Sequence, residues 1–516
     1  MKTCLSIVFF LLYMTICGHA QGYSTNNKKA VKLFEEAKSV AGNGLYARSL
    51  QLLHEVLEMD STFFEAYLLS SDIYQETDSI HLQVKALETA VRVRSTKYPK
   101  VFYTLGNAYY ASGNYQQAID TYNKYLEEAG ASGTFVIQAR QNLEKSSQAI
   151  YLVNNPVPFN VKSLGPNINT ADDEYWPSLT VDGQMIIFTR LLGSGNFAGP
   201  VPDMLQEDFF TSRLIDNVWQ QSEPVASVNT RDNEGAQSIS SDGKLLFFTA
   251  CGRRDGVGSC DIYFSRNKDG NWSEPRNAGV PVSSGTWESQ PSISANGKVL
   301  YFVSNRKGGK GGMDIWKCDL LGFSEKEFPV WGPPVNLGDS VNTAGNENSP
   351  FIHPDNQTLY FASDNWAGLG GYDIFYCRKV NEFAWTKPRN IGYPINSFRD
   401  EQGLVVDASG RNAYYSSDRK GSQRRDIYTF ELHPDAQPVP VTYIKGMVTD
   451  AATGEPLCAS VELVDLQDTT TNSTVESCWE PGQFLVSLPL GREYAFTVAK
   501  EGYLFYSENY QLKEIM

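Results

Sequence analysis

A pattern that recurs five times between residues 174 and 428 constrains this chain more than any other feature of its sequence. Each copy reads as a short strand, a polar two-residue turn and a second strand, which is the signal of a β-hairpin. The copies are EYWPSLTVDGQMIIFTR from Glu174, EGAQSISSDGKLLFFTA from Glu234, ESQPSISANGKVLYFVS from Glu288, ENSPFIHPDNQTLYFAS from Glu347 and EQGLVVDASGRNAYYSS from Glu401. After a variable loop, a third strand opens with an aspartate, at Asp208, Asp261, Asp314, Asp373 and Asp426. Repeated antiparallel units of this kind are typical of the blades of a β-propeller.

A fourth strand follows in the first four copies, where it begins at a tryptophan, as in WGPPVNLGDSVNT at 331–343. The fifth copy has no such strand, but an equivalent segment, VPFNVKSLGPNINT at 157–170, precedes the first copy. We therefore expect 157–170 to pair with the strand at Asp426. The result would be a closed five-bladed β-propeller over 157–432 with no exposed sheet edge.

Residues 26–154 show helical periodicity instead, most clearly in KVFYTLGNAYYASGNYQQAIDTYNKYLEEA at 100–129. The small residues Gly106 and Ala118 lie on successive predicted helices, and Gly113 lies in the turn between them. This unit resembles a tetratricopeptide repeat, and weaker copies occur at 66–91 and 30–60. We predict an all-α tetratricopeptide solenoid that ends with a capping helix over roughly 134–150.

The resemblance to tetratricopeptide repeats implies a concave groove that binds protein. Six residues would face into this groove: Leu68, Asp72, Gln75, Tyr103, Asn107 and Tyr110. The alternative is that the aromatic residues here only pack helices together. We expect that structural role for Tyr109 and Tyr122, and leave both roles open for Tyr103 and Tyr110.

The last segment differs from both preceding regions. HPDAQPVPV at 433–441 is a proline-rich stretch that we interpret as a linker. Alternating apolar residues and glycine-containing turns over 442–516 then predict a small antiparallel β-sandwich. This segment resembles the non-catalytic carboxypeptidase-regulatory-like modules.

The N-terminus, MKTCLSIVFFLLYMTICGHAQGYS, has the three parts of a secretory signal peptide. We expect residues 1–20 to be removed by cleavage after Ala20. Lipidation of Cys17 is the alternative, although Ile16 is bulky for such a site. No later apolar stretch approaches the ~20 residues that cross a bilayer, so the chain is predicted to be exported and to contact membranes only through partners.

Export permits disulfide bonds. Cys251 and Cys260 bracket a glycine-rich turn, and Cys458 and Cys478 share the last segment, so either pair could form a bridge. Cys318 and Cys377 are expected to be buried apolar residues. The sequence has no Cys-x-x-Cys motif and only five scattered histidines, so we predict no metal site and no cofactor.

Charge and glycine content exclude two further classes of function. Acidic residues outnumber basic residues by 59 to 44, which argues against general affinity for nucleic acid or anionic lipid. The run GGKGG at 308–312 lacks the Lys-Ser/Thr pair and the following helix of a phosphate loop. We expect its glycines to serve a tight turn with positive φ.

The acids that recur in every copy have two possible roles. Convergent carboxylates can bind a cation or ligand, but a residue that is fixed in every repeat more often caps a turn through local backbone amides. We expect the structural role for both the glutamate and the aspartate series.

The order of solenoid, propeller and sandwich resembles the periplasmic OmpA-family proteins associated with type IX secretion, and the propeller resembles those related to TolB. This resemblance implies a non-enzymatic scaffold in the periplasm, associated with the outer membrane, whose partners are outer-membrane or secretion proteins. Family members usually continue into a peptidoglycan-binding domain, which we do not find after 442–516, so peptidoglycan binding is not expected. The alternative is a glycan- or peptide-binding protein that uses the propeller face, supported by Trp287 and Trp366 if they are exposed.

Overall fold

The computed structural model describes residues 22–94, 98–129, 133–193, 205–268, 270–324, 328–419, 422, 424–467, 472–477 and 482–512. The predicted signal peptide, with Cys17, and Cys478 lie outside this range. The chain divides into two units, residues 1–151 and 152–516. Within the described residues, no helix has both the length and the apolar character that crossing a membrane requires.

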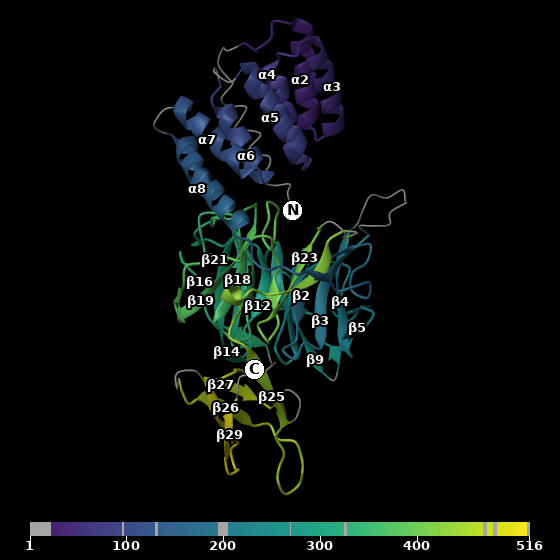
Figure 1. Cartoon of the computed structure of the whole chain (residues 1–516). Helices are drawn as coiled ribbons and strands as arrows, with labels where there is room; N and C mark the ends of the chain where they lie inside the picture. Colours follow the sequence, from purple (N-terminus) through teal and green to yellow (C-terminus); the bar gives the residue numbers. More distant parts are fainter. Residues whose placement is uncertain are drawn as a thin grey trace. The chain divides into compact units, whose positions relative to one another are not determined.

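The N-terminal unit is built from helices that pack in successive pairs (Figure 1). They are α2 (Lys28–Gly42), α3 (Tyr46–Met59), α4 (Phe64–Glu76), α5 (Ile80–Arg94), α6 (Lys100–Ala111), α7 (Tyr115–Ala129) and α8 (Thr134–Asn154). The turn inside each pair contains one residue with positive φ, which is Gly44, Asp78 or Gly113. The prediction of tetratricopeptide-like helical pairs in this region is confirmed.

Small residues decide how closely the paired helices approach. A Cβ atom on Gly106 would lie 2.5 Å from Cε1 of Tyr122, and Ala118 is fully buried. Ser49 occupies the Ala118 position in an earlier repeat, and its hydroxyl donates to the carbonyl oxygen of Ala37 at 2.8 Å. The predicted packing role of Tyr122 agrees with its burial.

The second unit contains five antiparallel sheets, each formed mainly by one copy of the repeat (Figure 1). The first sheet contains β2 (Asp173–Leu179), β3 (Met185–Leu192), β4 (Gln206–Ile215), β5 (Val218–Trp219) and β6 (Glu223–Pro224). The second sheet contains β7 (Glu234–Ile239), β8 (Leu245–Cys251), β9 (Cys260–Lys268), β10 (Asn271–Trp272) and β11 (Arg276–Asn277). The third sheet contains β12 (Glu288–Ile293), β13 (Val299–Ser304), β14 (Asp314–Phe323), β15 (Pro329–Trp331) and β16 (Val335–Asn336). The fourth sheet contains β17 (Glu347–Ile352), β18 (Thr358–Ser363), β19 (Asp373–Asn381), β20 (Ala384–Trp385) and β21 (Arg389–Asn390). The fifth sheet contains β1 (Lys162–Ser163), β22 (Val405–Val406), β23 (Asn412–Ser417) and β24 (Asp426–Glu431). In the first four, the expected fourth strand is two short segments that both pair with the third strand.

The fifth sheet is completed by the segment that precedes the first repeat. Lys162 pairs with Thr429 and Ser163 with Tyr428. The Asn169 side chain also accepts from the amide of Ile427 at 2.8 Å and donates to its carbonyl oxygen at 2.9 Å. Asn342 binds Ile315 in the same way within the third sheet. The predicted pairing of 157–170 with the strand at Asp426 is therefore observed, and the β-propeller architecture follows from the sheets themselves.

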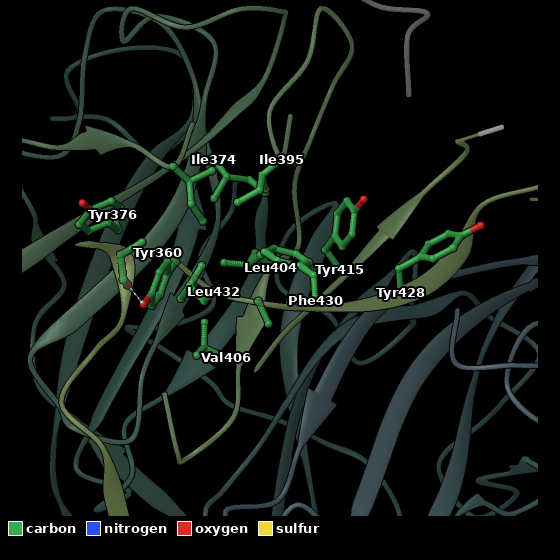
Figure 2. Close-up of a cluster of buried hydrophobic side chains, with 13 residues drawn as sticks. Tyr360, Ile374, Tyr376, Ile395, Leu404, Val406, Tyr415, Tyr428, Phe430 and Leu432 are labelled. Atoms are coloured by element: carbon green, nitrogen blue, oxygen red, sulfur yellow. Dashed lines mark hydrogen bonds between the residues drawn. The ribbon is translucent and has the colours of Figure 1, made fainter. Parts of the chain in front are cut away.

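Serine hydroxyls join the inner strands of neighbouring sheets. The amide of Ile239 donates to Oγ of Ser178 at 3.1 Å, and equivalent bonds run from Ile293 to Ser238 at 3.1 Å and from Ile352 to Ser292 at 3.0 Å. Phe351 and Val405 occupy the serine position in the fourth and fifth sheets. These two sheets instead contribute to one apolar cluster that includes Tyr360, Leu404, Val406, Tyr415 and Phe430 (Figure 2).

The segment interpreted as a linker lies against the fourth sheet. Tyr360 donates its hydroxyl to the carbonyl oxygen of Ala436 at 2.5 Å (Figure 2), and the Arg378 guanidinium donates to Gln437 O at 2.9 Å. The amide of Val439 reaches Oδ2 of Asp355 at 3.1 Å. Residues 433–441 are thus attached to the propeller rather than detached from it.

The C-terminal residues form two antiparallel sheets. One contains β25 (Val441–Met447) and β28 (Gln483–Pro489), and the other has the order β27 (Asn472–Glu476), β26 (Ser460–Asp465), β29 (Glu493–Ala499) and β30 (Tyr506–Gln511). Residues of both sheets share one core, which is Val461, Leu463, Phe484, Val486, Leu488, Tyr494 and Phe496.

Candidate functional site

The six predicted groove residues lie on two helices, α4 and α6, at intervals of three or four positions. On α4 these are Leu68, Asp72 and Gln75; on α6 they are Tyr103, Asn107 and Tyr110. Gln75 is exposed and the other five are partly buried. Residues at such intervals share one face of a helix, so each helix presents one continuous stripe of these side chains.

Asp72 has the one carboxyl group among these six side chains, and its pKa is shifted. Burial raises the pKa of Asp72 to about 7, and the negative charge of Glu76 acts in the same direction. Lys100, in the first turn of α6, opposes this increase, while burial lowers the pKa of Lys100 itself. The ammonium group of Lys100 also lies 4.1 Å from the ring centroid of Phe135. This face of α4 therefore carries a carboxyl group whose pKa lies near neutral pH.

Helix α8 adds polar groups that orient the α6 stripe. Tyr103 donates its hydroxyl to Oε1 of Gln138 at 3.1 Å. Asn107 Oδ1 accepts from the hydroxyl of Tyr122 at 2.8 Å and from Nδ2 of Asn142 at 3.0 Å. The side-chain oxygen of Asn107 thus already accepts two hydrogen bonds from within the fold.

Two further predicted residues have neighbours inside the helical unit. Gln75 accepts from Nε2 of Gln83 at 3.1 Å, and the ring of Tyr110 packs edge-on against Tyr115 at a centroid distance of 5.5 Å. Sequence reasoning missed Lys100, Gln138 and Asn142. For Lys100 the sequence carried no signal. For Gln138 and Asn142 the signal was their helical spacing, which places both on one face of α8.

Each of the five recurring glutamates caps the turn that precedes its strand. Its carboxylate accepts from the amide and hydroxyl of the residue four positions earlier, which is Thr170, Thr230, Ser284, Thr343 or Ser397. Arg190, Arg253 and Arg306 pair with the first three glutamates. This is the expected structural role. In the described part of the chain, no group of three or more His, Cys, Asp or Glu side chains is arranged to hold a metal ion.

The recurring aspartates explain the glycine-rich loops. Asp314 accepts from the amides of Lys310 and Gly311, so these amides are not available to a phosphate. The expectation that positive φ requires the glycines is correct only for Gly308. A Cβ atom on Gly309 would lie 2.2 Å from Oδ2 of Asp314, and one on Gly311 would lie 2.1 Å from the carbonyl oxygen of Gly345. Close approach of the loop to its neighbours is the main reason for glycine.

Cysteine side chains form one disulfide bond and two buried thiols. Cys251 and Cys260 form a disulfide bond between β8 and β9. Cys318 and Cys377 are buried free thiols, as expected. The Cys458–Cys478 pairing stays a prediction because Cys478 lies outside the described residues.

Trp287 and Trp366 are partly buried against one apolar cluster, and they do not supply the exposed aromatic surface that would support glycan binding.

Comparison with known proteins gives one family match, which lies within the helical unit. The tetratricopeptide repeat family matches residues 99–131, and no curated protein sequence matches the chain. Similar solved structures include MamA (22% identity, 24% of this chain and 66% of that chain, TM-score 0.22), the Sgt2 TPR domain from Aspergillus fumigatus (19%, 28% and 95%, TM-score 0.23) and TolB from Acinetobacter baumannii (15%, 58% and 71%, TM-score 0.32). TM-scores this low do not establish a shared fold.

Proposed function

We propose that this chain is a non-enzymatic scaffold that binds protein partners in the groove of its helical repeats. In this proposal the five sheets are the blades of a five-bladed propeller and residues 442–516 form a β-sandwich. The scaffold acts in the periplasm beside the outer membrane, and its partners are outer-membrane or secretion proteins.

The observation that carries the proposal is the arrangement of polar and aromatic side chains on α4, α6 and α8. Asp72, Lys100, Tyr103 and Tyr110 combine charge, hydrogen-bonding groups and aromatic surface along adjacent helices. Aromatic residues held by their neighbours provide contact area at low entropic cost, which favours recognition of a peptide or protein surface. The match of residues 99–131 to a repeat family that generally binds proteins supports the same function.

The non-enzymatic part of the proposal rests on the recurring acids. The glutamates are engaged with turn amides, and three of them with arginines. Asp261, Asp314 and Asp373 bind loop amides in the same way. These groups are committed to the fold, which supports a binding function over a hydrolytic one.

Crosslinking in the native cell envelope, followed by mass spectrometry, tests the groove. We expect the wild-type chain to crosslink to a defined envelope protein, and a variant carrying Gln75→Arg and Tyr110→Ala to lose that partner. Lys124→Glu, on the exposed side of α7, is the matched control and should retain it. Equal crosslinking by the groove variant, with unchanged helical circular dichroism, would exclude the groove as the binding surface.

A further inference from the structure

The strand β30 has an open edge in the four-stranded C-terminal sheet. It pairs with β29 on one side and ends the order β27, β26, β29, β30, and no described strand pairs with its other side. Next to it, the amide of Leu512 donates to the carbonyl oxygen of Arg492 at 3.0 Å. Because an antiparallel ladder alternates, the backbone N–H groups of Ser507, Asn509 and Gln511 point away from β29. β30 contains no proline, so its outer edge can accept a further strand.

One face of β30 continues the apolar core but is not covered. Phe496 on β29 is buried and lies opposite Glu508. The rings of Tyr506 and Tyr510 lie edge-on to Phe496, at centroid distances of 6.3 and 5.5 Å. Side chains at alternate positions share one face of a strand, so Tyr506, Glu508 and Tyr510 extend the row of core residues. Even so, Tyr506 is 56% exposed and Glu508 is exposed.

The loop before β30 adds apolar surface beside this edge. Leu504 is 97% exposed and Phe505 is 72% exposed. Tyr503, at the start of the loop, donates its hydroxyl to Oδ2 of Asp450 at 2.9 Å. Adjacent exposed apolar side chains mark an interaction site more strongly than isolated ones. An open strand edge beside such side chains is the arrangement that strand addition uses, because main-chain hydrogen bonds give affinity and side chains give specificity.

Glu508 determines which charge this surface recognises. The hydroxyls of Tyr506 and Tyr510 both donate to Oε2 of Glu508, at 2.7 and 2.9 Å. These hydrogen bonds lower the pKa of Glu508, so its carboxyl group is ionised at neutral pH. Oε1 accepts no hydrogen bond from the described residues. An ionised carboxylate between two aromatic rings matches a guanidinium or ammonium group, which combines a charge-assisted hydrogen bond with contact to a ring face.

The charge of the C-terminal segment disfavours two other occupants. Residues 442–516 contain eleven acidic and four basic residues. A second copy of this chain would bring the same acidic surface, and an anionic lipid would be repelled in the same way. A charge on the inner face of an edge strand also discourages pairing with a like edge. A strand that carries a positive charge compensates Glu508 instead.

We propose that β30 and residues 503–505 bind an extended basic segment of another protein. The segment adds to the sheet as a strand beside β30 and places a lysine or arginine side chain against Glu508. Its apolar side chains cover Leu504 and Phe505. This surface belongs to the C-terminal sheets and does not depend on the groove of the helical unit, so either binding site can fail without the other.

Fluorescence anisotropy of labelled, capped octapeptides tests the proposal on the whole chain. Valine alternates in these peptides with arginine, glutamine or glutamate. We expect saturable binding of the arginine peptide, about tenfold weaker binding of the glutamine peptide, and no saturation by the glutamate peptide. An arginine peptide with N-methyl groups at alternate backbone positions cannot form the ladder and should not bind.

Three variants separate the carboxylate from the strand edge. Glu508→Gln should weaken binding of the arginine peptide about tenfold at an unchanged melting temperature. Glu501→Gln is the matched control, because it removes one negative charge from the exposed adjacent loop and should change binding less than about twofold. Asn509→Pro removes an outward N–H without removing a bond to β29 and should abolish binding.

The proposal is overturned if the arginine peptide does not saturate, if its N-methylated form binds as tightly, or if Glu501→Gln weakens binding as much as Glu508→Gln. Two further measurements detect other occupants. A dimer in analytical ultracentrifugation that Asn509→Pro disrupts would assign the edge to a second copy of the chain. Sedimentation with phosphatidylcholine vesicles that Leu504→Ser abolishes would assign the loop to a lipid surface. Either result would also overturn the proposal.

Discussion

Two glutamates at the same repeat position are expected to respond in opposite ways to substitution by glutamine. Glu288 lies 3.2 Å from the guanidinium of Arg306. Among the described residues, Glu401 accepts hydrogen bonds only from the amide and hydroxyl of Ser397, at 2.9 and 2.6 Å. Burial raises the pKa of Glu401 to about 8 from its ordinary value of 4.5, and the charges of two nearby aspartates add to this increase. We predict that Glu401→Gln stabilises the sheet unit at pH 8 and that Glu288→Gln destabilises it.

The size of the stabilisation by Glu401→Gln follows from the difference between the pKa of Glu401 in the folded chain, about 8, and its ordinary value of 4.5. In the folded chain the ionised carboxylate is disfavoured, so the cost is fully present above pH 8 and disappears as the pH falls towards 4.5. At about 1.4 kcal/mol per pH unit, the upper limit is ~5 kcal/mol, and relaxation around the site should reduce the measured value to about 2 kcal/mol. Glutamine carries no charge, its one side-chain oxygen can still accept from the Ser397 amide, and its NH2 group can donate to the Ser397 hydroxyl oxygen. The variant should therefore show a flatter pH dependence of unfolding.

Urea unfolding followed by tryptophan fluorescence measures this difference. All nine tryptophans lie after residue 152, so the signal reports on the second unit. The free energy of unfolding of the Glu401→Gln variant should match that of the wild type at pH 5 and exceed it at pH 8. The free energy of unfolding of the Glu288→Gln variant should be about 3 kcal/mol lower than that of the wild type at both pH values, since Arg306 is left buried without its counter-charge. A Glu401→Gln variant that is less stable than the wild type at pH 8 would refute the reasoning.

Three further predictions concern other parts of the chain. Asp72→Asn should raise the melting temperature of the helical unit more at pH 8 than at pH 5, measured by circular dichroism. Burial raises the pKa of Asp72 to about 7, so the folded chain bears the cost of the ionised carboxylate above pH 7, and this cost shrinks as the pH falls towards 3.8. An equal increase at both pH values would contradict this. Gly309→Ala should cost about 2 kcal/mol in urea unfolding through collision with its aspartate neighbour, whereas Gly285→Ala, which meets open space, should stay within about 0.5 kcal/mol. Replacing Cys251 and Cys260 by serine should lower the free energy of unfolding by about 2 kcal/mol, measured by urea unfolding of the variant and the wild type under the same oxidising conditions.

The repeated sheets were predictable because strand periodicity and turn residues recur at matching positions in the sequence. Alignment of 157–170 with segments such as 331–343 was sufficient to predict which strand completes the last sheet, since the same asparagine clamp occurs in both. The helical pairs were predictable for the same reason: Gly106 and Ala118 mark positions where only a small residue fits.

The details of the candidate sites were not predictable, because they depend on proximity in space. Lys100 affects Asp72 across two helices, and no local pattern signals that pairing. The positive φ angles two positions after the recurring glutamates gave no signal either, because Trp176, Ala236 and Ser349 are not residues that usually adopt such angles. Gly403, at the same repeat position, matches the usual preference.

Completion of the last sheet also fixes an order of events during biosynthesis. Asn169 and Ile427 are hydrogen-bonded although 258 residues separate them in the sequence. A ribosome therefore produces one half of this contact long before the other, and the early strand must remain unpaired in the meantime. Contacts this distant slow folding. Nascent chains that stop before Ile427 should thus expose a sheet edge that chaperones can recognise and the finished protein does not show.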